Sequence, residues 1–308
     1  MSDGPEKIVF IINPISGTRA KHNIPELIRK MIDTRKYDPE IRFTEGRGHA
    51  RELALRMAER GVPYVVAVGG DGTVNEVASG LRGSETALGI IPLGSGNGLA
   101  RDLHIPLEPR RAIKVLNEPV VKPIDYGLAN DRPFFSTCGF GFDAYVGWIF
   151  EKSGQRGFLS YSWAFVRAVF SYRHRAYSFL ADGSGFTEEA VLVTIANSSQ
   201  FGYNARVAPT ASLQDGKLNL VIVKQIPLFR APSLILRLFT RMLDKSKYVR
   251  SIPFSSLQIR RTRKGLSHLD GDCVVMGEEI VIEVVPAGLK VMAGPERSHP
   301  EWRSLFDL

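Results

Sequence analysis

The run 65-VVAVGGDGTVNE-76 joins an apolar segment to a glycine-rich turn that carries one carboxylate. Its valine-rich half predicts a short strand, and the half after the glycines predicts a helix. Gly69, Gly70 and Gly72 let backbone N–H groups approach a ligand closely, and the positive end of the helix points to the same place. The run therefore predicts a phosphate cradle, with Asp71 where Mg²⁺ would bridge to the phosphates. The alternative is an ordinary strand-turn-helix connection, because Gly and Asp are common turn residues.

Two other segments repeat this arrangement of a strand followed by a polar glycine turn. Residues 8–12 lead into 13-NPISG-17, and residues 88–91 lead into 92-PLGSGNGLAR-101. In a parallel sheet the loops after neighbouring strands meet at one edge, so three such loops can converge on one ligand. We therefore expect the three turns to form a single binding site.

The spacing of apolar residues changes once along the chain. Up to residue 122, strands expected near residues 8, 41, 64 and 88 alternate with helices expected from residues 24, 49, 73, 98 and 109, which predicts βαβ units and a parallel sheet. Later runs are mostly strand-like, which predicts an antiparallel sandwich with two helical insertions. These strands are expected at residues 134–138, 178–181, 190–196, 218–223, 257–261, 280–285 and 289–292. The chain is thus expected to be an α/β protein with domains over residues 1–123 and 124–293.

Length and composition agree with two folded domains. The chain has 308 residues, 44% of them hydrophobic, which is enough for substantial cores. Residues 1–7 are polar, the first apolar run is too short for a secretory signal, and no run approaches the roughly 18 apolar residues of a membrane span. Cys138 and Cys273 are too few for a disulfide framework or a zinc site. We therefore expect a cytoplasmic protein whose two cysteines are reduced and at least partly buried.

The net charge of +8 indicates an anionic partner. No nucleic-acid motif accompanies the charge, so nucleic acid is not expected as a partner. Residues 161–175 and 228–250 instead combine large apolar side chains with arginines, which suits peripheral association with an anionic membrane surface. The alternative for both segments is a core-facing amphipathic helix with solvated arginines. In the second segment the pattern consists of Leu234, Ile235, Leu238, Phe239 and Met242 beside Arg230, Arg237 and Arg241.

Taken together, the glycine turns are similar to the diacylglycerol kinase catalytic domain family, which includes bacterial lipid kinases, sphingosine kinases and ceramide kinases. The matching residues are 13-NP-14 with Ser16 and Gly17, 69-GGDGTVNE-76, 92-PLGSGN-97 with 99-LAR-101, and 270-DGD-272 near the carboxyl end. The resemblance implies an NAD kinase- or phosphofructokinase-like domain, a β-sandwich, and an active site in the cleft between them. It also implies that residues 294–308 pack back onto the first domain. The GGDGT run alone is shared with NAD kinases and, in similar form, with phosphofructokinases.

For the phosphoryl donor, the resemblance implies ATP and Mg²⁺. A second Mg²⁺ would be held by Asp215 and the backbone carbonyls of Ser212 and Lys217, and Asp125 would connect it to the nucleotide side through Ser95. From the residues alone, a hairpin turn is the alternative for Asp215 and a strand end is the alternative for Thr44. The nucleotide site would be formed by Asn13, Thr44, Gly69, Gly70, Asp71, Gly72, Thr73, Ser95 and Gly96, with Asn75 and Asn97 supporting the loops.

For the acceptor, Asp272 is the expected general base. Bacterial lipid kinases of this family typically have Asp-Gly-Glu here, so Asp272 shortens the reach by one methylene. A displacement of about 1 Å can cost on the order of 100-fold in rate, so the backbone must compensate or another carboxylate must act. Sphingosine kinases suggest that other solution, in which Asp71 acts on the hydroxyl. Asp270 is at least as well explained as a turn residue as it is as a catalyst.

The leading hypothesis is an ATP-dependent lipid kinase that phosphorylates the hydroxyl of a diacylglycerol-like or sphingoid lipid at a membrane surface. A soluble NAD kinase and a nonenzymatic lipid-sensing module are the alternatives. An exposed edge strand in the sandwich would support a homodimer. The lipid itself stays open, and the candidates for an apolar lining between the domains are Phe140, Phe142, Trp148, Phe158 and Trp163.

Overall fold

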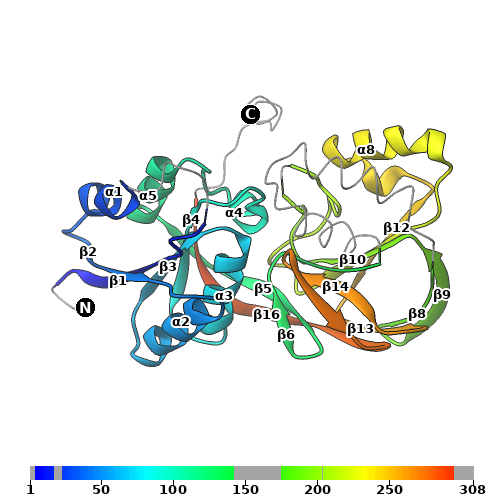
Figure 1. The fold of residues 1–308 in the computed structure, drawn as a ribbon, viewed down its shortest axis with the longest axis horizontal. Helices are drawn as coiled ribbons and strands as arrows, with labels where there is room; N and C mark the ends of the chain where they lie inside the picture. Colours follow the sequence, from blue (N-terminus) through cyan, green and yellow to red (C-terminus); the bar gives the residue numbers. More distant parts are fainter. Residues whose placement is uncertain (1–3, 17–22, 142–174, 203, 295–308) are drawn as a thin grey trace.

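Two lobes lie side by side in the computed structural model, which describes residues 4–16, 23–141, 175–202 and 204–294 (Figure 1). Helices cover the amino-terminal lobe, and the other lobe is built mainly of strands. The predicted fold class, a parallel α/β domain followed by an antiparallel sandwich, is confirmed. Among the described residues, no helix has the length and apolar character needed to cross a membrane.

The amino-terminal lobe is a parallel sheet between two layers of helices. Helices α1 (Ile24–Met31) and α5 (Pro109–Asn117) cover one face, whereas α2 (His49–Glu59) and α3 (Asp71–Leu81) cover the other (Figure 1). A sheet covered on both faces buries its inner strands, which explains their continuous apolar sequences, whereas the edge strand at Tyr37–Phe43 is partly exposed. The strands lie in the order β2-β1-β3-β4, with β1 at Glu6–Ile12, β2 at Tyr37–Phe43, β3 at Tyr64–Gly69 and β4 at Ala87–Pro92, and β4 leads into the short helix α4 at Gly98–Asp102.

Two long strands connect the lobes. Strand β5 (Val120–Ala129) pairs antiparallel with β16 (Glu279–Ala293) along almost its whole length. At one end Val291 lies beside Leu88 of β4, and at the other end β16 continues into the sandwich sheet. The register shifts between Val285 and Leu289, so the paired strands carry a bulge at the junction. The chain therefore passes between the lobes within a hydrogen-bonded ladder, which restricts how they can move.

The second lobe is a sandwich of two antiparallel layers. One layer continues the large sheet in the order β16-β13-β8-β9, and the other has the order β12-β11-β10-β7-β14-β15. Phe179 and Leu257 from the first layer pack with Phe140 and Leu220 from the second in one buried core. The bounds are β6 Arg132–Phe134, β7 Thr137–Gly141, β8 Arg175–Ala181, β9 Ser184–Ala190, β10 Leu192–Ala196, β11 Leu218–Val223, β12 Val249–Phe254, β13 Ser256–Arg261, β14 Gly265–Leu269 and β15 Asp272–Met276.

One predicted strand is interrupted. The sequence predicts a continuous strand over residues 134–138, but the structure has β6 ending at Phe134 and β7 starting at Thr137. The backbone N–H groups of Phe135, Ser136 and Thr137 all donate to the carboxylate of Asp270. Three successive amides turned toward one side chain cannot follow the alternating direction of a strand, so the ladder breaks here.

The prediction of a helix over residues 228–250 is wrong beyond Phe239. Helix α8 spans Ala231–Phe239 and ends where Arg241 adopts a left-handed conformation with φ of 60°. The N–H of Met242 then donates to the carbonyl of Arg237 at 3.0 Å, which is the bonding of a Schellman cap. A short 3₁₀ turn, η3 (Leu243–Lys245), follows, and β12 begins at Val249.

Some expectations concern residues outside the described parts of the chain. These are the helix over residues 161–175 except Arg175, which instead begins β8, the packing of residues 295–308, and the lining residues Phe142, Trp148, Phe158 and Trp163. Phe140 of the same set is completely buried in the sandwich core. The outer strands β9, β12 and β15 leave sheet edges at which a homodimer stays a prediction.

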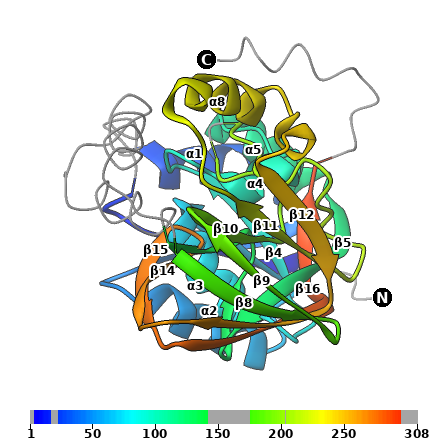
Figure 2. The same cartoon turned by 90° about the vertical axis from the view of Figure 1, so that its right-hand side faces the viewer.

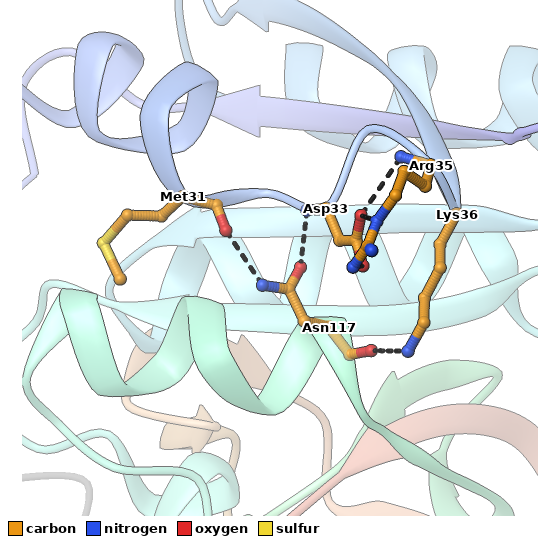
Figure 3. A network of polar contacts seen from close by, with 5 residues as sticks. All are labelled: Met31, Asp33, Arg35, Lys36 and Asn117. Atoms are coloured by element: carbon orange, nitrogen blue, oxygen red, sulfur yellow. Dashed lines mark hydrogen bonds and ion pairs between the residues drawn. The ribbon is translucent and has the colours of Figure 1, made fainter.

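A polar network joins the end of α5 to the turn between α1 and β2 (Figure 3). The side-chain amide of Asn117 donates to the carbonyl of Met31 at 2.8 Å, and its oxygen accepts the N–H of Asp33 at 3.0 Å. Lys36 donates to the carbonyl of Asn117 at 2.9 Å. The adjoining Arg35 guanidinium hydrogen-bonds Asp33 and lowers the pKa of that carboxyl to about 2. The Asn117 side chain, at the end of α5, thus satisfies backbone groups at the end of α1 and in the turn that follows.

We expect Asn117→Ala to lower the free energy of unfolding by about 1–3 kcal/mol, because the half-buried Met31 carbonyl and Asp33 N–H lose their partners. Denaturant unfolding followed by circular dichroism measures this change. Arg35→Ala is the control: its side chain is 89% exposed, so it should alter stability little. Equal stability of Asn117→Ala and the parent would contradict the assignment.

Candidate active site

The parallel sheet brings the predicted loops to one edge. Each loop begins with a backbone hydrogen bond to the neighbouring strand. The N–H of Thr44 donates to Ile12 at 2.9 Å, that of Asn13 to Val68 at 3.1 Å, and that of Leu93 to Gly69 at 2.8 Å. The loops after β1, β2, β3 and β4 are therefore held in one continuous row at the carboxyl ends of the strands. This is the position at which parallel α/β sheets bind ligands.

The glycine turn after β3 allows backbone to contact backbone. A Cβ atom on Gly94 would lie 2.7 Å from the Cα of Gly70, so the two glycine loops touch without room for a side chain. A Cβ on Gly69 would lie 2.4 Å from Oγ1 of Thr73, and that hydroxyl accepts a hydrogen bond from Asn13 at 3.2 Å. Helix α3 begins directly after Gly70, and no side chain caps its first turn. The start of α3 thus presents backbone N–H groups of the kind that bind phosphate.

Asp71 holds the loop that follows β4. Its carboxylate accepts the N–H of Asn97 at 2.8 Å and that of Gly98 at 2.9 Å. Asn97 has φ of 51° and bonds both backbone groups of Gly94 through its side chain, which closes the loop into a ring. Burial raises the pKa of Asp71, the two amide bonds oppose this rise, and the negative charge of Asp270 adds to it. Asp71 and Asn97 therefore determine the shape of the 94–98 loop, on which Ser95 is exposed and Gly96 lies against Asp71.

Asp270 joins the second lobe to helix α3. Its carboxylate accepts the side-chain amide of Asn75 at 2.7 Å in addition to the backbone N–H groups of Phe135, Ser136 and Thr137 at 2.7–2.9 Å. Burial raises the pKa of Asp270, and these four donors act in the opposite direction. Its φ of 49° does place it in a turn, but the turn serves to aim the carboxylate at the other lobe.

The expected base, Asp272, faces the glycine turn from the second lobe. Its Oδ1 lies 3.7 Å from where a Cβ on Gly72 would be, so the carboxylate lies directly against the Gly72 backbone. Oδ2 accepts a hydrogen bond from the Arg47 guanidinium at 3.1 Å, and the Asp272 side chain is 50% exposed. The structure thus brings Asp272 next to the start of α3, across the junction between the lobes.

Three other groups shape this site but were not predicted as site residues, although Glu76 and Arg101 lie within the matching motifs. Glu76 on α3 accepts the N–H groups of Gly48 at 2.8 Å and Ala50 at 3.2 Å, which fixes the loop after Thr44 and the start of α2 at His49. The other two, Arg101 and Asp102, lie on α4 and bind the second lobe. Glu76 lies within the 69–76 run, so its carboxylate, one turn along α3, could have indicated a role in the site.

A segment of the second lobe closes over the 94–98 loop. A Cβ on Gly202 would lie 2.8 Å from the Cα of Gly96, and Gly202 has a φ of 126°, so this contact requires glycine. Arg101 donates to the carbonyl of Gly96 at 3.1 Å and to Asn204 at 3.0 Å. The carboxylate of Asp102 accepts three bonds, from the N–H and hydroxyl of Ser199 and from the side-chain amide of Gln200.

The predicted second metal site lies at the bulge between β5 and β16. Asp125 is 3% exposed, and its carboxylate oxygens accept the N–H groups of Gly216 and Ala287, each at 2.7 Å. Asp215 is exposed and accepts the N–H of Lys217 at 3.1 Å, while the Ser212 hydroxyl accepts the N–H of Gln214. These bonds describe a well-formed turn. Within the described ranges, no cluster of three or more His, Cys, Asp or Glu could hold a metal ion, and the ligand set of Asp215 with backbone carbonyls stays a prediction.

Comparison with known proteins identifies the fold and its family. A family model of the diacylglycerol kinase catalytic domain matches residues 7–129, and a model of the YegS C-terminal NAD kinase beta sandwich-like domain matches residues 136–293. The chain belongs to the diacylglycerol kinase family. As a member of this family it is a phosphotransferase with an alcohol group as acceptor.

Relatives of this diacylglycerol kinase-family chain match over most of its length. A "Probable lipid kinase YegS-like" protein of Cronobacter sakazakii is 27% identical over 291 residues, which cover 92% of this chain and 95% of that protein. A "Diacylglycerol kinase" of Bacillus subtilis is 31% identical, covering 70% of this chain and 73% of the relative. A crystal structure of a diacylglycerol kinase from Bacillus anthracis has a TM-score of 0.72 at 22% identity and covers 94% and 97% of the two chains, which establishes the common fold.

We expect Asp270→Ala to lower the free energy of unfolding by about 3 kcal/mol or more, because four N–H donors lose a charged acceptor in a buried place. Thermal and denaturant unfolding measure the loss. Asp38→Ala, which removes only a surface ion pair with Lys7, is the matched control and should change stability little. Similar stability of the two variants would show that Asp270 does not join the lobes.

Proposed function

We propose that this protein is an ATP-dependent lipid kinase that transfers the γ-phosphate to the hydroxyl of a diacylglycerol-like or sphingoid lipid at a membrane surface. One observation carries the proposal: two glycine loops meet at the uncapped start of α3, and Asp272 faces that place from the other lobe. Phosphoryl transfer needs a phosphate cradle and a carboxylate near the acceptor hydroxyl, on opposite sides of the reacting phosphorus. The two lobes supply one each.

The residues at the start of α3 fit a nucleotide's phosphates and Mg²⁺. Gly72 has no side chain between the helix start and Asp272, and the contact between Gly70 and Gly94 keeps side chains away from the helix start. Asp71 is the carboxylate that would hold the ion, since each of its oxygens accepts one amide and keeps a second lone pair. When bound, Mg²⁺ neutralises the charge of the transferring phosphate. Asn13, Thr73 and Ser95 would contribute neutral polar groups around it.

Asp272 is better placed than Asp71 to accept the proton of the lipid hydroxyl. Asp71 holds the loop after β4 and would also hold the ion, whereas Asp272 is half-exposed and belongs to the opposite lobe. The hydroxyl proton would pass to the Asp272 carboxylate as the oxygen attacks phosphorus. The Arg47 guanidinium hydrogen-bonds that carboxylate at 3.1 Å across the junction.

The relatives favour a lipid over NAD as the acceptor. Proteins similar to this chain over most of their length are named as lipid or diacylglycerol kinases, and the match to the diacylglycerol kinase model covers the whole nucleotide-type lobe. The second lobe has the NAD kinase-like sandwich in either case, so the sandwich alone does not separate the two acceptors.

Transfer of labelled phosphate from ATP and Mg²⁺ to diacylglycerol, sphingosine and ceramide in mixed micelles tests the proposal. We expect one lipid class to be phosphorylated and NAD to be left unmodified. The matched control is Asp71→Asn, which keeps the size of the side chain but removes the charge that would hold Mg²⁺, and it should lose transfer to every lipid. Transfer to NAD and to none of the lipids would overturn the proposal.

We expect Asp272→Ala to reduce lipid phosphorylation by about 100- to 10,000-fold, the range for losing a general base. Asp272→Glu should keep more activity than Asp272→Ala, since it restores a carboxylate of longer reach. The thermal midpoint of each variant shows whether the fold is kept. Full activity of Asp272→Ala would instead assign the base to Asp71.

A further inference from the structure

We propose that the basic cavity beside α8 binds the anionic headgroups of membrane phospholipids and so docks the second lobe on the bilayer. This inference deepens the proposed function, on which its biological role rests. It identifies the membrane-facing surface and the lipid chemistry that this surface recognises, which neither the family match nor the active-site geometry provides.

The cavity has a volume of about 290 Å³ and a cationic lining. Four of its residues are basic, and no carboxylate belongs to the lining. Within the part of the chain that the structure describes, none of these four side chains forms an ion pair, whereas the nearby Arg250 and Lys224 both pair with Glu188. Unpaired cations that converge on one hollow are suited to a phosphate-bearing group. The lining residues are Arg230, Ser233, Leu234, Arg237, Lys245, Ser246, Lys247 and Tyr248.

Large apolar side chains stand exposed around the same helix. Phe229 is 79% exposed, Leu236 is 64% exposed and Met242 is 41% exposed. Leu238 and the cavity-lining Leu234 instead pack against a buried cluster of the second lobe, so the cavity lies beside the face by which α8 is held. The helix therefore has one face held by the protein and another that presents apolar groups beside cations. That combination is typical of helices that lie in a membrane interface.

The apolar groups favour a bilayer over other anionic partners. A nucleic acid or a free phosphate would use the cations but would leave Phe229 and Leu236 in water. A membrane surface satisfies both, since headgroup phosphates meet the basic cavity while the apolar side chains enter the acyl boundary.

The cavity and the exposed Phe229, Leu236 and Met242 together form the proposed docking surface. This surface is connected to the candidate nucleotide site. Helix α8 lies at the outer edge of the second lobe in both views (Figures 1 and 2). The N–H of Arg206 donates to the carbonyl of Leu238 on α8 at 2.8 Å. Gly202, four residues before Arg206, contacts Gly96 of the 94–98 loop. Arg206 thus contacts the membrane-facing helix, and Gly202 contacts the loop that Asp71 holds.

Sedimentation with vesicles tests the docking surface without any catalytic step. We expect the full-length protein to bind vesicles of phosphatidylcholine with phosphatidylglycerol, and not vesicles of phosphatidylcholine alone. The double variant Arg230→Gln/Lys247→Gln should bind on the order of 25-fold more weakly, because each basic residue near an anionic surface contributes about five-fold. Phe229→Ser should also weaken binding, and that loss should persist at high salt. Circular dichroism and thermal midpoints check that the variants fold.

The matched control is Arg29→Gln/Lys30→Gln, which removes the same charge from exposed positions on α1 at the other end of the molecule. It should bind vesicles like the parent. Equal binding by both double variants would overturn the proposal, and so would binding to an acidic peptide or nucleic acid but not to vesicles. Phosphorylation of lipid in neutral detergent micelles separates the two ideas: docking variants should keep it, and its absence in the parent would refute the kinase proposal alone.

Discussion

The site depends on two carboxylates that accept backbone N–H groups from other loops. Asp71 and Asn75 lie one turn apart at the start of α3, and through them this helix holds the loop after β4 and, by way of Asp270, the break between β6 and β7. Burying a carboxylate is unfavourable unless its oxygens are hydrogen-bonded, so each loop conformation is stabilised only when its amides point at the acid. The geometry of the cradle follows from this requirement.

The two lobes therefore contribute different groups to the site. The first lobe presents backbone amides at strand ends, and the second presents Asp272 and the segment that covers Gly96. The ladder between β5 and β16, together with the bonds of Asp102 to Ser199 and Gln200, keeps the two contributions in register. Reaction between a nucleotide and a lipid hydroxyl needs such relative placement more than it needs reactive side chains.

Local patterns predicted the amino-terminal lobe well because buried parallel strands and their glycine turns are encoded within short runs. The same patterns could not identify the role of Asp270, whose partners lie 133–195 residues away and which resembles an ordinary Asp-Gly turn. The edge strands β9, β12 and β15 were not anticipated, since edge positions mix exposed and buried residues, and the inner strand β14 was also not anticipated. The end of α8 depends on the left-handed conformation of Arg241, a residue with no particular preference for it.

The most direct test of the account is a structure of the protein with a nonhydrolysable ATP analogue and Mg²⁺. We expect phosphates against the backbone of Gly70, Asp71 and Gly72 and of the 94–98 loop, with Asp71 still bonded to Asn97 and Gly98. We also expect Asp272 to face the terminal phosphate from the second lobe. A nucleotide bound elsewhere, or a terminal phosphate directed away from Asp272, would contradict the account.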